Sequence, residues 1–314
     1  MIAFLMCGCF GDGSSVNKTG ELPTDTSKIN TKGWVDSPWI SRDGNKMFFM
    51  YSQYNFFPIF ELIPGSPRLE GPLREGHHAV DPDTGNPFWD SDIYVSEKSE
   101  SGWSKPVNLG LNDEKGDCCH IFVNSMSRIY YTKENSGTGT DLYYRDLDGS
   151  GNPLGALVLI EELVSDTNED NPHVTESDDA MWFTSSRDGG QGGKDIWFSH
   201  KVDGVWQSPV NIGSPINTDK DEDQFWISDN PGLPKRVLFN RGSQIFESFR
   251  DGSNFSTPVY VDLGLKYVGE ASMPYSEDIL YFASSNPDSD VQQIKIYSAV
   301  RNSDGTFQKP IPLD

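Results

Sequence analysis

Residues 36–49 read Asp-Ser-Pro-Trp-Ile-Ser-Arg-Asp-Gly-Asn-Lys-Met-Phe-Phe, and residues 170–183 read Asp-Asn-Pro-His-Val-Thr-Glu-Ser-Asp-Asp-Ala-Met-Trp-Phe. Each stretch runs from an acid through a short strand and a polar turn into an apolar run. Weaker copies of this stretch begin near Asp117, Asp223 and Glu270. Beyond the first interval the copies are spaced by roughly 50 residues, and a repeat of that length rich in strands and turns is typical of a β-propeller blade.

Each repeat divides into four predicted strands. After the acid strand and the aromatic strand comes an alternating strand, for example Lys194-Asp-Ile-Trp-Phe198, followed by a glycine hairpin and a proline-containing last strand such as Trp206-Gln-Ser-Pro-Val210. Proline suits an outermost strand, where a missing N–H breaks no sheet hydrogen bond. The sequence therefore predicts an all-β chain folded as a five-bladed β-propeller of four-stranded antiparallel blades, starting near residues 36, 117, 170, 223 and 270.

Several phrases of the third repeat carry a resemblance to a known family. They are Asn168-Glu-Asp-Asn-Pro172, Phe183-Thr-Ser-Ser-Arg-Asp-Gly-Gly190, Gly193-Lys-Asp-Ile-Trp197 and Trp206-Gln-Ser-Pro-Val-Asn-Ile212. They resemble the TolB-type, WD40-like β-propeller repeat of exported bacterial proteins, over about residues 33 to 314. That resemblance implies a propeller fold. It leaves activity open, because the family includes periplasmic adaptors, peptidoglycan-associated proteins and some carbohydrate-active enzymes.

The first blade departs from the repeat. Residues 53–90 form an insertion where other blades have a short loop, and it contains Arg74, His77, His78 and Trp89. Long loops in compact domains are usually functional or disordered, and the aromatic content of this one argues against disorder. We predict a ligand-binding segment here, within a single propeller domain over residues 20–314. A closed ring also needs its last blade held to its first, and residues 20–30 are the candidate lock.

The N-terminus predicts export. Residues 1–19 begin with the apolar run Met-Ile-Ala-Phe-Leu-Met-Cys-Gly-Cys-Phe and continue into a Gly- and Ser-rich linker. This resembles the end of a bacterial lipoprotein signal, although it has no basic residue before the apolar run. Cys9, which follows a glycine, is the expected lipidation site. The expected location is the periplasm or the cell surface of a bacterium, with membrane attachment through the lipid anchor alone.

The charge balance narrows the class of partner. The formal net charge is −22, from 47 acidic and 25 basic residues. An acidic surface of this kind repels phosphate backbones and anionic lipid, so nucleic acid is not an expected partner. No cofactor is expected, although calcium would suit such a charge. The expected partners are a glycan or an exported envelope protein.

The repeated acids are the first candidate functional residues. Repetition places Asp36, Asp117, Asp170, Asp223 and Glu270 at equivalent points of the innermost strands, near one mouth of the central channel. One interpretation makes each acid part of the scaffold, hydrogen bonded to the neighbouring blade. The other makes Asp36, Asp170, Asp223 and Glu270 catalytic, since glycoside hydrolysis needs a pair of carboxyl groups about 5–10 Å apart. Val35-Asp36-Ser37-Pro38 resembles the Asp-Pro opening of five-bladed furanosidases, with a serine inserted.

Histidines and aromatic residues are the second set of candidates. His120 and His173 occupy one repeat position, three residues after the acid, where other blades have Trp39 and Trp226. With His77 or His78 they would make a possible metal site, as in propeller lyases that act on uronic-acid polymers. Packing inside the blade is the alternative for the two histidines. Trp39, Trp226 and Trp89 offer flat faces for sugar stacking, or fill the spaces between blades.

These observations leave three hypotheses for function. The first is a non-catalytic exported propeller that binds a glycan or a protein at the channel mouth and the blade-one insertion. The second is a glycoside hydrolase of the five-bladed kind. The third is a metal-dependent polysaccharide lyase. Whether the chain is an enzyme depends on the state of the repeated carboxylates.

Overall fold

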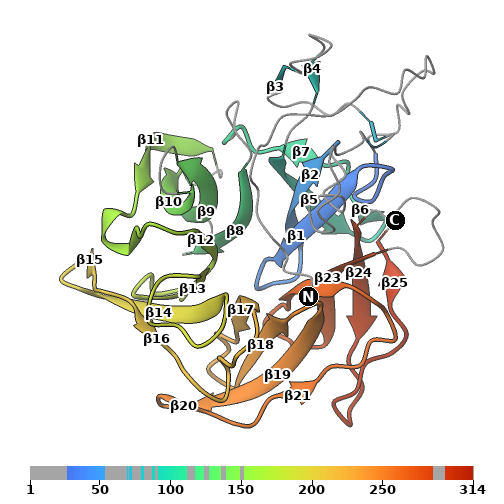
Figure 1. Cartoon of the computed structure of the whole chain (residues 1–314). Coiled ribbons are helices and arrows are strands. Elements are labelled where there is room, and N and C mark those ends of the chain that lie inside the picture. The colour runs from blue at the N-terminus through green and yellow to red at the C-terminus, as the bar shows by residue number, and fades with distance from the viewer. Residues whose placement is uncertain are drawn as a thin grey trace. The chain divides into compact units, whose positions relative to one another are not determined.

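The computed structural model describes residues 27–53, 69, 71–72, 79–80, 87–88, 91–111, 117–123, 127–135, 139–148, 152–285 and 294–313. Within these ranges the chain is all-β except for one 3-10 turn, η2 (Glu161–Leu163). Five small antiparallel sheets form the blades of a five-bladed β-propeller (Figure 1). The predicted fold class is confirmed. No helix in the described ranges is long and apolar enough to cross a membrane.

The strands follow the predicted repeat closely. Blade one contains β1 (Trp34–Ile40), β2 (Lys46–Ser52), β5 (Asp92–Ser99), β6 (Gly102–Trp103) and β7 (Val107–Asn108). Blade two contains β8 (Asp117–Val123), β9 (Arg128–Asn135), β10 (Gly139–Leu147) and β11 (Pro153–Leu159). Blade three contains β12 (Glu169–Val174), β13 (Ala180–Ser185), β14 (Asp195–Val202), β15 (Val205–Trp206) and β16 (Val210–Asn211).

The last two blades repeat this order. Blade four contains β17 (Glu222–Ile227), β18 (Lys235–Arg241), β19 (Gln244–Asp251), β20 (Asn254–Phe255) and β21 (Val259–Tyr260). Blade five contains β22 (Val268–Ser272), β23 (Ile279–Ser285), β24 (Ile294–Val300) and β25 (Ile311–Pro312). A separate two-stranded ribbon, β3 (Ala79–Val80) and β4 (Pro87–Phe88), lies within the blade-one insertion.

The outermost strand is broken in three blades. In blades one, three and four it consists of two short pieces that both pair with the third strand of the blade. Pro106, Pro209 and Pro258 lie between the two pieces. The prolines thus mark the break in each edge strand, where no N–H donor is needed. Edges interrupted in this way offer little continuous backbone for pairing with another chain.

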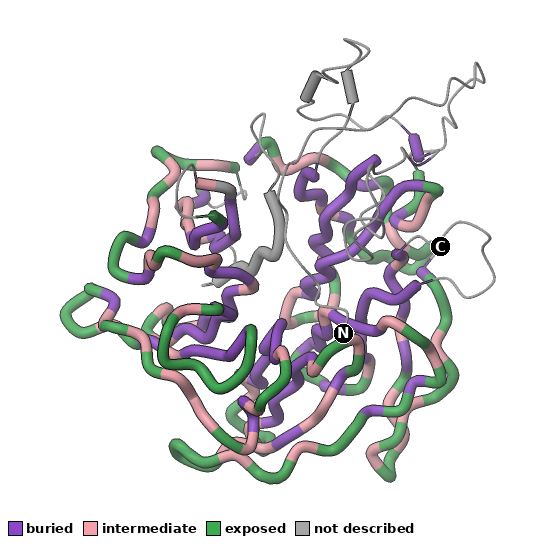
Figure 2. Tube along the Cα trace, viewed as in Figure 1, coloured by how far each residue is buried: buried purple, intermediate pink, exposed green. Residues whose placement is uncertain are grey.

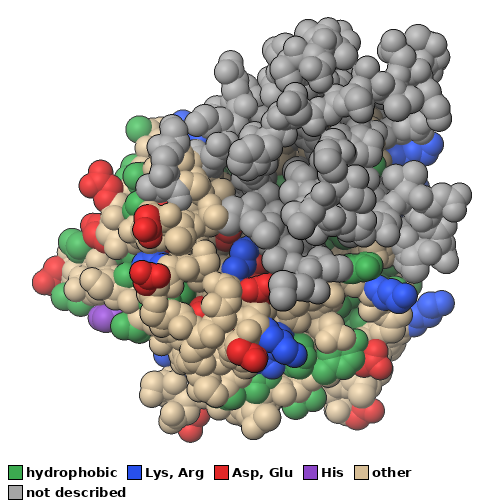
Figure 3. Space-filling model, in the orientation of Figure 1, with side chains coloured by type: hydrophobic (Ala, Val, Ile, Leu, Met, Phe, Trp, Pro, Cys, Tyr) green, Lys and Arg blue, Asp and Glu red, His purple; other side chains and the backbone are tan. Residues whose placement is uncertain are grey.

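Burial follows strand order within each blade. In β2, β13 and β23 all residues but the first are buried, whereas the end pieces β21 and β25 are exposed (Figure 2). A second strand covered on both faces explains its unbroken apolar run, because neither face needs polar residues. Acidic side chains are spread over the visible surface instead of gathering in one patch (Figure 3).

The chain forms two compact units. One consists of residues Cys119–Asp262 and Gly269–Ala271, and so contains blades three and four and most of blade two. The other contains blade one and most of blade five. In the first unit, Trp182, Ile196 and Phe239 belong to a core cluster that spans blades three and four. In the second, Val35, Tyr281 and Ile296 belong to a core cluster that spans blades one and five.

A cation held over an aromatic ring recurs where blades meet. The Lys201 ammonium lies 4.6 Å from the Trp206 ring centroid, pairs with Asp178 at 2.9 Å and lies 3.2 Å from the Tyr130 hydroxyl of blade two. In blade one, the Lys98 ammonium lies 5.6 Å from the Trp103 ring centroid and 3.4 Å from the hydroxyl of Tyr281 in blade five. Two joints of the propeller therefore use one arrangement at equivalent positions of the repeat.

Candidate functional site

A backbone irregularity positions the repeated acids. The register of β1, β12 and β17 shifts just after Asp36, Asp170 and Asp223, as in a β-bulge. The next residue has a positive φ in each case, 50° at Ser37, 50° at Asn171 and 56° at Gln224. A bulge bends the strand and redirects its side chains, and it is frequent beside functional sites. The sequence contains no glycine at these places to indicate it.

The same irregularity corrects the alignment of the fifth repeat. Glu270 has a φ of 59°, so it corresponds to Gln224 and Asn171 and not to the acids that precede them. Gly269 therefore occupies the acid position of blade five. A Cβ there would lie 2.8 Å from the Gln224 Oε1 and 3.0 Å from the Asn240 Nδ2, which leaves no room for a side chain. The equivalence of Glu270 with the other acids, expected from the sequence, is wrong by one residue.

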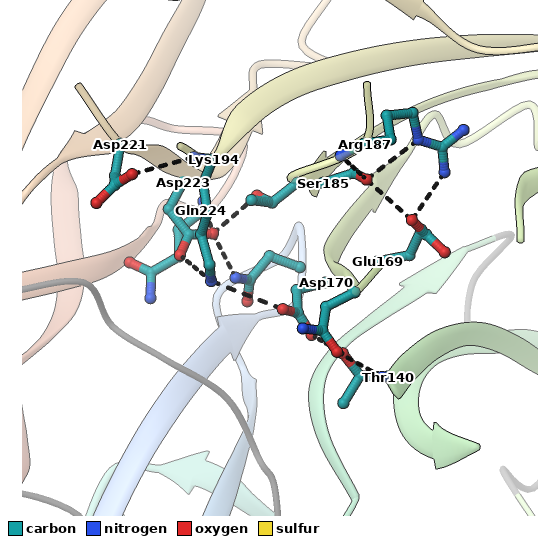
Figure 4. A network of polar contacts seen from close by, with 12 residues as sticks. Thr140, Glu169, Asp170, Ser185, Arg187, Lys194, Asp221, Asp223 and Gln224 are labelled. Carbon is teal, nitrogen blue, oxygen red and sulfur yellow. Dashed lines mark hydrogen bonds and ion pairs between the residues drawn. The ribbon is translucent and has the colours of Figure 1, made fainter. Parts of the chain in front are cut away.

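Asp170 and Asp223 share a buried lysine (Figure 4). The Lys194 Nζ lies 3.6 Å from the Asp170 Oδ2 and donates a hydrogen bond of 3.2 Å to the Asp223 Oδ2. Only 4% of Asp170 and 6% of Asp223 is exposed, and Lys194 is buried as well. A buried carboxylate stays ionised when a cation and hydrogen-bond donors compensate for lost water. Lys194 is that cation.

Uncharged donors complete the surroundings of the two carboxylates. The Thr140 hydroxyl donates to Asp170 at 2.8 Å. The Thr184 hydroxyl and the Asn171 side-chain amide donate to Asp223 at 2.7 Å and 2.6 Å. Thr140 comes from blade two and Thr184 from blade three, so each acid accepts from the blade before its own. The contacts tie neighbouring blades together.

Burial and charge act in opposite directions on the titration of this group. Burial raises the pKa of Asp170, and the Lys194 ammonium counteracts part of that effect. Burial alone would lower the pKa of Lys194, but the carboxylates of Asp223 and Asp170 outweigh it and raise that pKa. The lysine therefore remains a cation at neutral pH, and it favours the charged form of both acids.

Repetition identifies Lys194 as part of a joint between blades. Thr140 and Lys194 both directly precede a buried aspartate at the start of the third strand, Asp141 and Asp195. The Thr140 N–H donates to the Asn168 side chain at 2.8 Å, and the Lys194 N–H donates to the Asp221 side chain at 3.0 Å. Blade three thus places a charged donor where blade two has a hydroxyl. Comparing these repeats in the sequence would have singled out Lys194, which sequence reasoning missed.

Asp36 lies in the unit of blades one and five and has a different environment. Its carboxylate accepts from the Trp34 indole N–H at 2.5 Å and from the Ser37 hydroxyl at 3.3 Å. Burial raises the pKa of Asp36 to about 7, although both donors act to lower it. Trp34 is fully buried, so its ring packs in the core and is not available for sugar stacking. Asp36 is the repeated acid whose protonation changes nearest to neutral pH.

The remaining candidate residues are placed unevenly. His173 is buried with its ring centroid 6.3 Å from that of Trp226, and Trp39 lies 5.4 Å from Phe48. All three contacts are packing contacts within or between inner strands. Asp117 and His120 belong to β8, but their side chains are not described. Outside the described residues are Cys9, Arg74, His77, His78 and Trp89.

Metal ligation receives no support from the described part of the chain. Among those residues no group of three or more His, Cys, Asp and Glu side chains is arranged to hold a metal ion. The predicted pairing of His120 and His173 stays a prediction, because the His120 side chain is not described. The insertion returns to blade one at Leu69–Pro72, where the Tyr51 hydroxyl donates to the Pro72 carbonyl at 2.6 Å.

Comparison with known proteins gives likeness at the level of structure. No protein-family model matches the chain, and no curated protein matches it. TolB from Acinetobacter baumannii is 13% identical with a TM-score of 0.51 over 89% of this chain, which spans only 54% of that protein's chain. A GH43 endo-arabinanase from Bacillus licheniformis is 13% identical with a TM-score of 0.51, over 90% of this chain and 99% of that one.

A second glycoside hydrolase gives a similar result. A GH43 β-xylosidase/α-arabinofuranosidase from a compost microbial metagenome is 10% identical with a TM-score of 0.52, over 90% of this chain and 96% of that one. Identities this low are evidence of a common fold and carry no activity from one protein to the other. The chain is thus similar in fold to TolB and to GH43 glycoside hydrolases alike.

Proposed function

We propose that this propeller is a non-catalytic binding module for a glycan or an exported envelope protein, engaged at the channel mouth and the blade-one insertion. The observation that carries the proposal is the neutralised pair Asp170 and Asp223. Both carboxylates are buried, share Lys194 and accept hydrogen bonds from threonines of neighbouring blades. An acid engaged in this way holds blades together, and is not free to accept a proton from water or donate one to a sugar.

Asp36 favours a second candidate, a glycoside hydrolase. A buried carboxyl with a pKa of about 7 is half protonated at neutral pH, as a general acid requires. The GH43 likeness is compatible with this role but argues for the fold alone. In this second candidate Asp36 would act on a bound sugar, and its partner carboxyl remains to be assigned.

A single screen distinguishes the two. The protein would be tested on a panel of arabinan, xylan and peptidoglycan fragments for binding and for release of reducing sugar, beside Asp36→Asn and Asp223→Asn variants. We expect binding without sugar release, and loss of stability in Asp223→Asn. Sugar release that Asp36→Asn abolishes while the fold stays intact would overturn the proposal and establish the enzyme. Binding to none of the glycans would direct the search to a protein partner, by crosslinking in envelope extracts.

We also propose that the protein is exported and lipid-anchored through Cys9. The support is the apolar run and the glycine before Cys9 in the sequence. Metabolic labelling with a palmitate analogue in a bacterial host should label the wild-type protein and leave Cys9→Ser unlabelled. Equal labelling of both proteins, or of neither, would count against lipidation at this residue.

A further inference from the structure

The chain contains the same five-residue motif at its described N-terminal end and between blades three and four. Residues 27–31 read Ser-Lys-Ile-Asn-Thr, and residues 214–218 read Ser-Pro-Ile-Asn-Thr. In both copies the threonine hydroxyl accepts from a backbone N–H two residues later, from Gly33 at 3.1 Å and from Lys220 at 3.2 Å. The likeness therefore extends from the sequence to the local turn.

The internal copy shows what the motif does. The Asn217 Oδ1 accepts from the Ile196 N–H at 2.9 Å, and the Asn217 Nδ2 donates to the Ile196 carbonyl at 2.9 Å. Ile196 lies on β14, the third strand of blade three. The asparagine thus caps both backbone groups of one residue with a single side chain, as an extra strand would do.

The N-terminal copy makes the same contacts on blade five. The Asn30 Oδ1 accepts from the Ile296 N–H at 2.9 Å, and the Asn30 Nδ2 donates to the Ile296 carbonyl at 2.8 Å. Ile296 lies on β24, the third strand of its blade. A further hydrogen bond of 2.7 Å runs from the Asn30 Nδ2 to the carbonyl of Leu313, next to the outermost strand β25. About 280 residues separate these partners along the chain, since Leu313 is 283 positions from Asn30.

The isoleucine before each asparagine anchors the motif in a core that two blades share. Ile216 is fully buried in the cluster that spans blades three and four. Ile29 is fully buried in the cluster that spans blades one and five, beside Tyr281, Ile296 and Leu313. Burying an isoleucine side chain stabilises by about 1.5–3 kcal/mol, so the anchor is comparable in both places.

The two copies differ in how the chain continues. Residues 214–218 lie between β16 and β17, so the chain itself joins blade three to blade four. Residues 27–31 precede β1 and hold β24 of blade five through the contacts just described. No sheet pairing is printed between the two blades here; their other described contacts include the Ile40 N–H donating to the Ser272 hydroxyl at 3.1 Å and the Tyr275 N–H donating to the Arg42 carbonyl at 2.9 Å.

We propose that residues 27–31 are a closing strap, a terminal copy of the internal joint that holds the last blade to the first. Because the strap holds blade five by an asparagine and an isoleucine, it can leave without unpairing any strand. Its release is then a local opening of the joint between blades five and one, while blades three and four stay joined. Asp36 lies on β1, six residues after Asn30, so strap release loosens the strand that carries this candidate site residue.

Hydrogen exchange at single-amide resolution tests the strap. The probes are the Ile296 and Ile196 amides, each of which donates to the asparagine of one copy. The variants are Asn30→Ala and the matched Asn217→Ala, both in the full chain and well below the unfolding temperature. We expect Asn30→Ala to speed exchange at Ile296 about tenfold or more and leave Ile196 unchanged, with the converse in Asn217→Ala.

Two results would overturn the strap. One is an Ile296 amide that keeps its protection in Asn30→Ala. The other is loss of protection at both probes in either variant, which would mean that the motif stabilises the whole fold and opens no single joint. If Asn30→Ala does not fold, the wild-type protein in dilute urea decides the matter. Residues 27–31 and Ile296 should then exchange through a common opening that occurs before the opening at Ile196, and a shared opening of all three would reject the proposal.

Discussion

At the scale of single residues, the repeated acid has different consequences in different blades. Asp170 and Asp223 have a lysine between them, whereas Asp36 has an indole and a serine hydroxyl as printed donors. The difference follows from position 194, because blade three supplies an ammonium where blade two supplies the Thr140 hydroxyl. One substitution in a repeat therefore separates a compensated pair of carboxylates from an acid whose pKa burial raises to about 7.

Asp36 should make the stability of the protein depend on pH in a specific direction. Its pKa is about 7 in the folded chain and about 3.8 when unfolded, so the folded state holds the proton more tightly between these values. The contribution of Asp36 to stability is fully present below pH 3.8 and is lost as pH rises toward 7. Asp36→Asn removes this dependence and keeps an acceptor for the Trp34 indole.

Urea unfolding of wild type and Asp36→Asn at a series of pH values measures this effect. We expect the variant to gain stability relative to wild type as pH rises from about 5 to 8, by on the order of 2–4 kcal/mol. A difference between the two proteins that stays constant with pH would show that Asp36 titrates normally in the folded chain.

At the scale of elements, the joints between blades combine a cation, an aromatic ring and a polar side chain from the next blade. The Lys201 joint contains Trp206, Tyr130 and Asp178, and Arg128 pairs with the same Asp178 at 2.9 Å. The Lys194 joint is more deeply buried and contains the two repeated acids. Partners that come from different blades make each joint a contact of tertiary structure, whose loss separates neighbouring sheets.

Removal of the Lys194 charge should be strongly destabilising. Lys194→Met leaves two buried carboxylates without their cation, and breaking a buried ion pair typically costs about 3–5 kcal/mol. The loss should be largest near neutral pH and should shrink as pH falls, because protonation of Asp170 and Asp223 removes the uncompensated charge. Chemical unfolding at pH 5 and pH 8 measures both effects.

Lys46→Met is the matched control for that substitution. Lys46 pairs with Glu97 at 2.8 Å, but 41% of the Lys46 side chain and 63% of the Glu97 side chain is exposed. An exposed pair of this kind contributes about 0–1 kcal/mol, so the control should be nearly as stable as wild type. Equal losses in the two variants would show that burial of the Lys194 pair has no special weight.

At the scale of the whole molecule, the excess of acidic residues should oppose folding. The net charge is −22, and like charges brought together in a compact chain repel one another. Salt screens this repulsion over about 8–10 Å, while the buried Lys194 pairs are screened much less. Acidic side chains spread over the visible surface act through this general repulsion more than through single contacts (Figure 3).

Thermal unfolding at increasing sodium chloride tests the balance. We expect the midpoint to rise between about 20 mM and 500 mM salt, by a few degrees, as the repulsion is screened. Sodium sulfate at equal ionic strength separates screening from the general stabilising effect of sulfate. A midpoint that falls with sodium chloride would mean that attractive surface pairs outweigh the repulsion.

The sequence by itself determined the repeat, the strand order within each blade and the all-β fold. These follow from local pattern, since the apolar second strand Met181–Phe183, the hairpin at Asp203-Gly204 and the proline of the edge strand are each visible in a few consecutive residues. The repeat also located Asp36, Asp170 and Asp223. It misplaced Glu270, because a glycine at position 269 takes the place of the acid and shifts the likeness by one residue.

Only the tertiary structure decided what the acids do and how the two end blades are joined. Whether a carboxylate is compensated depends on donors from another blade, and Lys194 lies 29 residues from Asp223 in the chain. The strap depends on Asn30 and Ile296, which are 266 residues apart and whose relation no local pattern contains. Local propensity fixes the strands, but burial and hydrogen bonding between blades are set by packing, and these give the same acid different chemistry in different blades.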